Sequence, residues 1–349
     1  MHHVSRTARL LAALVVIGQL GCSGRSNGGG AGGRGATGIA GNGCAGGTCL
    51  NPTCKALGAP ASIGNFAEIG FERQPSYIPG DVVIPTFDDV PDRPYTAADG
   101  ARFSNFGDGD WTRKMLDFFD AADLHVDFFI NTSNFCDVAK NPGCRRTIAR
   151  MLASHNVGNH TVHHIHMGST LPHDGTDMFN NGCGAAGSCI VCDDEVTGVE
   201  SYVSALSEGT LPHLTRFRAP YGEPFQMGGD SLPLVRSVVA KHAVHVGWAM
   251  ESTDAEHDAD HLPGSFFADK IHSAVGGGPG ERAWGIILMH GTYPWSLSEV
   301  KLLLDPAAAS SLQHRGFRLG TVEDAICWKC GKHSWEIVQQ LGGQARGPN

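Results

Sequence analysis

Residues 81–89 read Asp-Val-Val-Ile-Pro-Thr-Phe-Asp-Asp, an apolar run that ends in the adjacent carboxylates Asp88 and Asp89. Such a run is typical of a buried strand, because strands covered on both faces are apolar throughout. Two desolvated carboxylates repel each other, and one is pushed toward protonation unless a cation lies nearby. The pair therefore indicates a metal site, a catalytic base, or both.

Similar runs recur after residue 57, separated by segments with helical periodicity. Strand and helix repeated about seven times predict a parallel α/β sheet or barrel. In such folds the site lies at the carboxyl ends of the strands and in the loops after them. The expected strands are Val82–Phe87, His125–Asn131, Asn156–Thr161, Thr215–Pro220, Ala243–Ala249, Trp284–His290 and Phe317–Val322. The expected helices are Trp111–Ala122, Arg145–His155, Ser201–Ser207, Leu232–His242, Phe266–Val275 and Val300–His314.

The composition limits the classes of partner. The 349 residues allow one large domain or two small ones, and the net charge is −9 with His neutral. No long basic run occurs, which argues against nucleic acid as the main partner.

Residues 1–22 resemble a secretory signal. Arg6 and Arg9 precede an apolar run at 10–17 that is too short for a membrane span. The run leads to Cys22, at a Gly-Cys junction that resembles a bacterial lipobox, so we expect a lipid anchor there. Ser23 resembles the residue that sorts a lipoprotein to the outer membrane. The anchored protein would then face either the periplasm or the cell surface. The alternative is ordinary signal cleavage with a free or disulfide-bonded Cys22.

A tether and a Cys-rich entry are expected to lead into the main domain. Residues 23–56 begin as a Gly-rich stretch that cannot bury enough apolar surface to order itself. Cys44, Cys49 and Cys54 close it, and we interpret them as a disulfide-stapled entry, with a Cys-only metal site as the weaker option. The domain is expected to span residues 57–340.

The other cysteines also indicate disulfides. There are eleven in all, so removing Cys22 leaves ten, an even number suited to an oxidising compartment. Cys136 and Cys144 flank one short loop and are expected to pair. For Cys327 and Cys330 we expect a structural disulfide rather than a redox motif, because no thioredoxin-like strand precedes them; metal ligation is the remaining option.

The stretch from Met167 to Asp194 interrupts the alternation of strands and helices. It holds several glycines and three cysteines but few apolar residues. We expect a long loop after the third strand, either pinned by disulfides or forming a substrate-contacting rim.

His160 and His164 follow the third expected strand, four residues apart. On the first turn of a helix this spacing puts both rings on one face, within reach of a common ion. Two imidazoles and a carboxylate form a facial set that leaves positions open for water and substrate. His163 and His166 lie beside the pair and are expected to support the loop.

Three more strand ends carry polar residues. Arg218 closes the fourth strand and needs an anionic partner, for which Asp88 is a candidate. The turn at Tyr221 could aim a backbone N–H into the site. Residues 248–254 and then His290 follow at later strand ends.

In their order and spacing, these segments resemble the five motifs of the polysaccharide deacetylases, the NodB-homology enzymes of carbohydrate esterase family 4. The motifs are Thr86-Phe87-Asp88-Asp89, His160-Thr-x-x-His164, Arg218-Ala-Pro-Tyr221, Trp248…Asp254 and Leu288-Met-His290, within residues 80–325. The resemblance implies a distorted (β/α) barrel of about seven strands. It also implies a divalent metal, most often Zn²⁺.

The resemblance implies metal ligands and a base. Asp89, His160 and His164 would bind the metal. Asp88 would be the general base, held in place by Arg218. The cation would neutralise one carboxylate and the guanidinium would favour ionisation of the other.

It also implies groups that stabilise the oxyanion and protonate the leaving amine. The Tyr221 backbone N–H would face the oxyanion, and Asp254 would orient His290, the general acid. Tyr221 and Trp248 would contact the substrate.

The chain departs from the family pattern beside three motifs. Val90, Ala255 and Gly291 stand where the family often has Gly, Trp and Asp. None of these changes removes a ligand, the base or the acid, so they bear on substrate preference. One wall of the substrate pocket is then either missing or supplied by Trp111, Trp248 or Trp295.

We expect an enzyme that removes acetyl groups from an N-acetylated polysaccharide outside the cytoplasm, either a chitin-type oligomer or peptidoglycan glycan. One alternative is an O-acetyl esterase acting on xylan with the same site. Another is a non-catalytic carbohydrate-binding relative, against which the presence of Asp88 and His290 argues.

Overall fold

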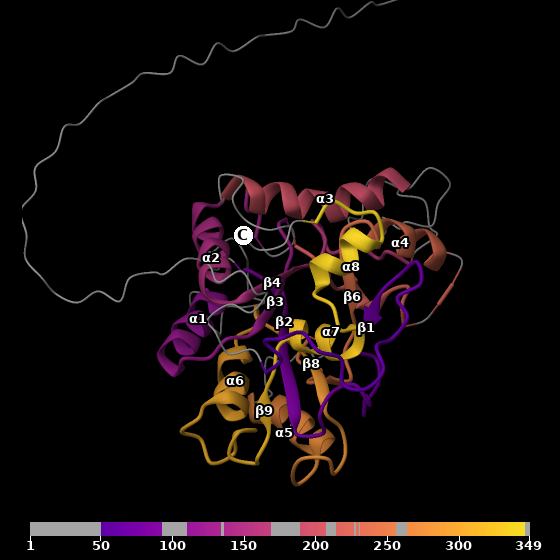
Figure 1. The fold of residues 1–349 in the computed structure, drawn as a ribbon. Helices are drawn as coiled ribbons and strands as arrows, with labels where there is room; N and C mark the ends of the chain where they lie inside the picture. The colour runs from indigo at the N-terminus through magenta and orange to yellow at the C-terminus, as the bar shows by residue number, and fades with distance from the viewer. Residues whose placement is uncertain are drawn as a thin grey trace, which may run out of the picture. The chain divides into compact units, whose positions relative to one another are not determined.

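A parallel sheet runs through the part of the chain that the structure describes and curls into a distorted (β/α) barrel (Figure 1). The computed structural model describes residues 50–92, 110–133, 136–168, 189–206, 214–226, 228–229, 231–255 and 264–345, all within one compact unit at 39–349. The strand order is β1-β6-β5-β4-β3-β2-β8-β7, and β9 pairs with the start of β2. The strands are β1 (Glu68–Ile69), β2 (Val82–Val90), β3 (Asp127–Ile130), β4 (Asn156–Asn159), β5 (Arg216–Phe217), β6 (Val244–Val246), β7 (Met250–Glu251), β8 (Gly285–His290) and β9 (Arg318–Leu319).

Helices connect the strands and cover the sheet. They are α1 (Trp111–Ala122), α2 (Pro142–Ser154), α3 (Cys189–Leu206), α4 (Leu232–Val239), α5 (Gly264–Val275), α6 (Ser296–Leu304), α7 (Val322–Cys330) and α8 (Ser334–Gln340), with a short 3₁₀ turn η5 (Pro220–Gly222). The predicted barrel is thus confirmed, and each of the seven predicted strands overlaps an observed one.

Several predicted boundaries were wrong. Helix α3 begins at Cys189, twelve residues before the predicted start, so it occupies the end of the stretch predicted as a loop. Helix α6 ends at Leu304 rather than His314, because Pro306 disfavours helical backbone at Asp305. Strands β1 and β7 and helices α7 and α8 were not predicted, since two-residue strands carry no readable period.

Strand β2 lies at the centre of the sheet and divides its side chains between two cores. Val83 and Phe87 pack into a cluster shared with α1, α2, α5 and α6. Val82 and Ile84 pack into a second cluster with α7 and α8, which lie in front of the strands in Figure 1. Both faces of the strand are therefore buried, which explains the unbroken apolar run in the sequence.

The disulfides confirm most of the sequence expectations and correct one. Cys136 pairs with Cys144 as predicted. Cys327 forms a structural disulfide as predicted, and its partner is Cys54 of the entry segment. Cys330 was expected in a disulfide too, but it is a buried free thiol. The Cys54–Cys327 bridge ties the entry segment to α7, and the backbone N–H of Asn51 adds a hydrogen bond to Asp324 of 2.7 Å.

The expectations for the signal, the lipid anchor at Cys22 and the tether fall outside the described residues. So do the Cys44 and Cys49 expectations and most of the loop predicted from Met167 to Asp194. Among the helices that the structure describes, none is long and apolar enough to cross a membrane.

The Cys54–Cys327 bridge closes a loop of most of the domain, which predicts a measurable stabilisation. Replacing Cys54 by Ser should lower the free energy of unfolding by about 2–4 kcal/mol, because the unfolded chain regains conformational freedom. Urea denaturation without reductant measures this change. Cys330→Ser is the matched control, and an equal loss in both variants would show that the bridge adds nothing.

Candidate functional site

An irregularity at the end of β2 brings its two carboxylates to one place. The pairing of β2 with β3 shifts register between Phe87 and Val90, and Asp89 has a φ of 63°. Adjacent residues of a regular strand point to opposite faces, whereas an extra residue in the ladder re-aims a side chain. Asp88 and Asp89 are 2% and 3% exposed, so both are held inside the edge of the barrel.

Asp89, His160 and His164 could hold a metal ion, because their ligand atoms all lie within 4.8 Å of one another. Asp89 Oδ1 lies 3.2 Å from His164 Nε2 and 3.7 Å from His160 Nε2. His160 Nδ1 lies 2.8 Å from the Arg218 carbonyl oxygen. A carbonyl only accepts, so Nδ1 carries the proton and Nε2 keeps its lone pair for the ion. Asn131 donates to Asp89 Oδ1 at 2.9 Å and fixes the carboxylate.

The two histidines lie on a loop and not on the helical turn that was predicted. Thr161 and His164 have φ angles of 66° and 58°, which no right-handed helix contains. The loop is held by its own polar groups: the Thr161 backbone N–H donates to Asn159 Oδ1 at 2.9 Å, and that of His164 donates to Thr161 Oγ1 at 3.0 Å. Burial lowers the pKa of both His160 and His164, so both rings are neutral and able to bind a cation.

Arg218, which directly follows β5, is fully buried beside this group. Its Nη1 donates to Asp88 Oδ1 and to Thr86 Oγ1, each at 2.7 Å. Its Nε donates to the Val246 carbonyl at 3.0 Å, and Nη2 donates to that of Gly247 at 3.2 Å. The guanidinium therefore has an anionic partner, as the sequence required, and it fixes the orientation of Asp88.

A second charged pair lies on the neighbouring strand end. His290 ends β8, in register with Asp88 on β2. Asp254 accepts from His290 twice, from Nδ1 at 2.7 Å and from the backbone N–H at 2.8 Å. Tyr293 lies beside the imidazole, with ring centroids 5.8 Å apart, and stacks on Trp295, whose Nε1 donates to the Asp254 carbonyl.

The environment sets the protonation of these two pairs. Burial raises the pKa of Asp88 to about 6, although Arg218 and His290 favour its ionised form. Burial alone would lower the pKa of His290, but the carboxylates of Asp254, Asp89 and Asp88 outweigh it and raise the pKa to about 9. Between these values the site holds an ionised carboxylate and a protonated imidazole, which are a base and an acid.

Aromatic side chains form a rim beside the candidate metal ligands, where Tyr221 contacts the His164 ring. Tyr221 is 42% exposed and stacks face to face on His166, with ring centroids 3.9 Å apart. Glu223 holds the His166 ring at 3.2 Å. Trp248 packs beneath this turn, so close that a Cβ at Gly222 would lie 2.9 Å from the indole. Tyr221 is thus the rim aromatic that faces solvent.

The departures from the family pattern have a steric explanation at two positions. The Val90 side chain occupies the space that a Cβ at Gly291 would fill. A larger residue at 291 is therefore excluded while Val90 is present. Ala255 is exposed and offers no wall, whereas Tyr293 contacts the His290 ring and stacks on Trp295.

Some contacts were not predicted. Asn131 and Thr86 support Asp89 and Arg218, and each is a polar residue inside or just after an apolar run, which is the signal that could have found it. No sequence pattern indicated that Tyr293 would lie beside His290. His163 was expected to support the loop, and it does so through Glu195, at 2.7 Å.

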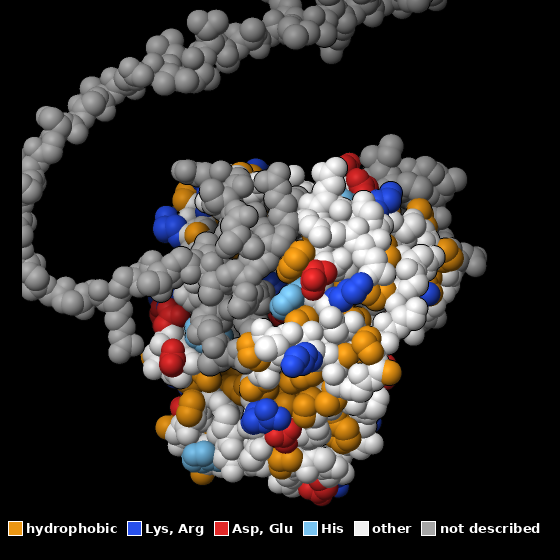
Figure 2. Space-filling view, viewed as in Figure 1, with side chains coloured by type: hydrophobic (Ala, Val, Ile, Leu, Met, Phe, Trp, Pro, Cys, Tyr) orange, Lys and Arg blue, Asp and Glu red, His pale blue; other side chains and the backbone are white. Residues whose placement is uncertain are grey.

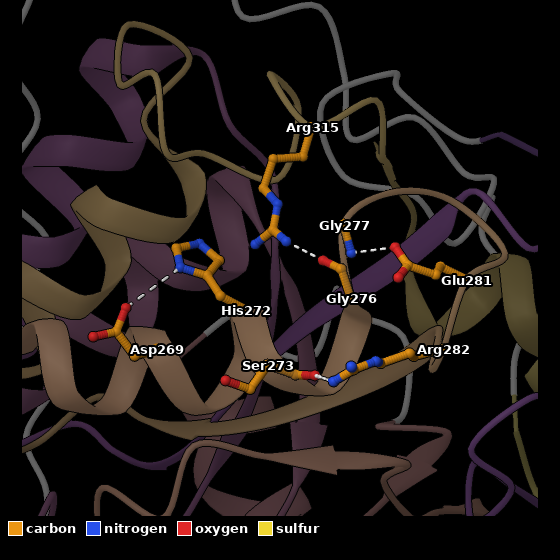
Figure 3. Close-up of a pocket in the computed structure, with 8 residues that line it drawn as sticks. All are labelled: Asp269, His272, Ser273, Gly276, Gly277, Glu281, Arg282 and Arg315. Carbon is orange, nitrogen blue, oxygen red and sulfur yellow. Dashed lines mark hydrogen bonds and ion pairs between the residues drawn. The ribbon is translucent and has the colours of Figure 1, made fainter.

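A further surface pocket lies near the start of β8, at the edge opposite the site (Figure 3). Its two arginines are engaged with the chain itself: Arg282 donates to the Ser273 carbonyl, and Arg315 donates to that of Gly276. On the described part of the face in Figure 2, Lys and Arg side chains are scattered singly among acidic and neutral ones.

The comparisons with known proteins point to one family. Residues 77–227 match the family model described as polysaccharide deacetylase. No protein with a curated description matches the chain. The matched segment includes Asp88, Asp89, the histidine pair and Arg218, but it ends before Asp254 and His290.

Several solved structures align with the chain. A chitin deacetylase from the fungal pathogen Colletotrichum lindemuthianum aligns with a TM-score of 0.51 and 20% identity over 76% of this chain and 93% of its own. A family 4 carbohydrate esterase from Streptomyces lividans aligns with a TM-score of 0.44 and 22% identity over 78% and 100%. A peptidoglycan N-acetylglucosamine deacetylase domain from Eubacterium rectale has a TM-score of 0.47 and 17% identity over 70% and 90%. The family model thus matches fewer than half of the residues, and the first of these structures supports the fold of this chain.

The Arg218–Asp88 pair predicts a large effect on stability. Replacing Arg218 by Leu leaves Asp88 buried without its counter-charge, which should cost about 3–5 kcal/mol of unfolding free energy at neutral pH. The pKa of Asp88 already lies above its unfolded value. The added penalty should therefore shrink as the pH falls and Asp88 becomes protonated.

Urea denaturation of a double-mutant cycle measures this. Asp88→Asn combined with Arg218→Leu should recover most of the stability lost in Arg218→Leu alone. Equal instability of the single and double variants would show that the loss comes from packing and not from the stranded charge.

Proposed function

We propose that this protein is a metal-dependent hydrolase that removes acetyl groups from an N-acetylated polysaccharide. One observation carries the proposal: the Asp88–Arg218 and Asp254–His290 pairs flank the group formed by Asp89 and its two histidines. A base, an acid and a candidate metal site thus share one buried strand edge. Amide hydrolysis needs these three elements together, since water must be activated and the amine must leave protonated.

Asp89, His160 and His164 are the residues that would hold the metal. Two neutral imidazoles and one carboxylate suit Zn²⁺ and leave coordination positions open. When bound, such an ion lowers the pKa of water and polarises the acetyl carbonyl. The resemblance to the family favours zinc among the divalent metals.

The protein's own side chains then move the protons. Ionised Asp88, held by Arg218, accepts a proton from the attacking water. The Tyr221 backbone N–H donates to the oxyanion, and a donor of this kind typically contributes about a hundredfold or more in rate. His290, kept charged by Asp254, donates its proton to the leaving amine.

The proposed substrate rests on the similar structures, and the proposed location rests on the N-terminal sequence. Two of the similar structures are a chitin deacetylase and a peptidoglycan N-acetylglucosamine deacetylase, so these N-acetylated glycans are the proposed substrates. The secretory signal at residues 1–22 and the lipobox-like Cys22 support an exported protein anchored to a membrane, with Ser23 favouring the outer one. Trp248 and the exposed Tyr221 are the proposed substrate contacts.

Acetate release tests the proposal. The purified protein should release acetate from N-acetylglucosamine oligomers or peptidoglycan, lose this activity with a chelator and regain it with Zn²⁺. Release from acetylxylan alone would establish an O-acetyl esterase instead. Retained metal with no release from any acetylated glycan would point to a carbohydrate-binding protein.

Matched variants separate the base from the ligands. Asp88→Asn should retain the metal but lose turnover by about a hundredfold or more, because the proton acceptor is gone. His160→Ala should lose the metal itself, as measured by elemental analysis. If Asp88→Asn stays fully active, another group is the base.

The rate should depend on pH with two limbs. Activity should rise as Asp88 loses its proton, near or below pH 6 because a bound cation also favours the ionised form. It should fall as His290 loses its proton, near pH 9. Initial rates across pH, at saturating substrate, give both limbs, and a rate that keeps rising above pH 9 would exclude His290 as the acid.

A further inference from the structure

A further buried carboxyl group interacts with Asp254 of the Asp254–His290 pair. Glu299, in the first turn of α6, is fully buried. The side chains that interact with it are those of Asp254 and Ser252. Among the described residues, no group donates a hydrogen bond to either of its carboxyl oxygens, and the buried Ser252 hydroxyl is also unsatisfied.

This arrangement is costly if Glu299 is ionised. Two adjacent carboxylates in a buried site repel each other. A buried acceptor without a donor also loses its hydrogen bonds to water and gains none in return. In the described part of the chain, the charged groups on this side are Asp254 and, beyond it, His290, which Asp254 already engages twice. Burial and the Asp254 charge raise the pKa of Glu299 well above its usual range.

A proton on Glu299 resolves the problem. The protonated carboxyl can donate to Asp254, and its carbonyl oxygen can accept from the Ser252 hydroxyl. The Glu299 carboxyl then has a partner in Asp254, and the site carries one negative charge instead of two. Helix α6 packs closely against the start of α5, because α5 begins with Gly264. A Cβ at that position would collide with Ser298 and lie 3.0 Å from the Glu299 backbone nitrogen.

We propose that Glu299 is a positioning residue that stays protonated and donates a hydrogen bond to Asp254. The catalytic part of this inference rests on the proposed function, because it concerns the acid His290. A donor on Asp254 draws charge away from its contact with the imidazole, which weakens the hold of Asp254 on the His290 proton. The imidazole thus remains charged yet can still release its proton to the leaving amine.

Infrared spectroscopy tests the protonation without any assay of activity. The difference spectrum between the wild-type protein and Glu299→Gln should contain the carbonyl stretch of a protonated carboxylic acid. The measurement belongs at pH 8, where Asp88, Asp92 and Asp127, each with a pKa of about 6, are ionised. A difference spectrum with only carboxylate bands would overturn the proposal.

The pH profile tests the effect on His290. Glu299→Gln keeps a donor for Asp254 and an acceptor for Ser252, so its turnover should stay within about twofold of the wild type. Glu299→Met keeps the volume but removes the donor. Its turnover should fall by roughly tenfold and its alkaline limb should move up by about one pH unit, since Asp254 then holds the His290 proton more tightly.

These outcomes separate the inference from the proposed function. If Gln and Met shift the alkaline limb equally, the carboxyl proton is not what matters, and the inference fails while the enzyme stands. If Met changes stability alone and leaves the profile intact, Glu299 only packs. If the wild-type protein releases no acetate from any glycan, the proposed function fails, and the infrared result still decides the protonation of Glu299.

Discussion

The site depends on the burial of one guanidinium. Arg218 has no exposed surface, and an unpaired charge there would cost several kcal/mol. Its hydrogen bonds join Asp88 and Thr86 on β2 to the carbonyls at the end of β6, and its own carbonyl fixes the ring of His160. The contacts that make the charge tolerable are therefore the ones that aim the carboxylate and choose the imidazole tautomer.

A parallel sheet supplies the rest of the geometry at little cost. Every strand ends at the same edge, so residues distant in the sequence converge without long connections. The bulge at Asp89 adds the one irregularity that this plan requires. Without it, adjacent carboxylates on β2 would point to opposite faces, and the proposed base and ligand could not share a site.

The sequence predicted the parts of the structure that repeat. The apolar run of β2 and the periodicity of α1 identified their elements, and the polar residues at strand ends identified most of the site. The loop of His160 and His164 was mistaken for a helix, because positive φ angles at non-glycine residues leave no pattern. The pairing of Cys327 with Cys54 joins residues 273 apart, which no local signal reveals. Glu299 was missed because the helix was predicted to begin at Val300, so no periodicity indicated that Glu299 would be buried.

The contact between Val90 and Gly291 limits which side chains these two positions can hold together. Because one side chain fills the room that the other position would need, the two sites cannot change independently. A side chain at position 291 fits only where position 90 is small, so the effects of substitutions at the two positions are not expected to add.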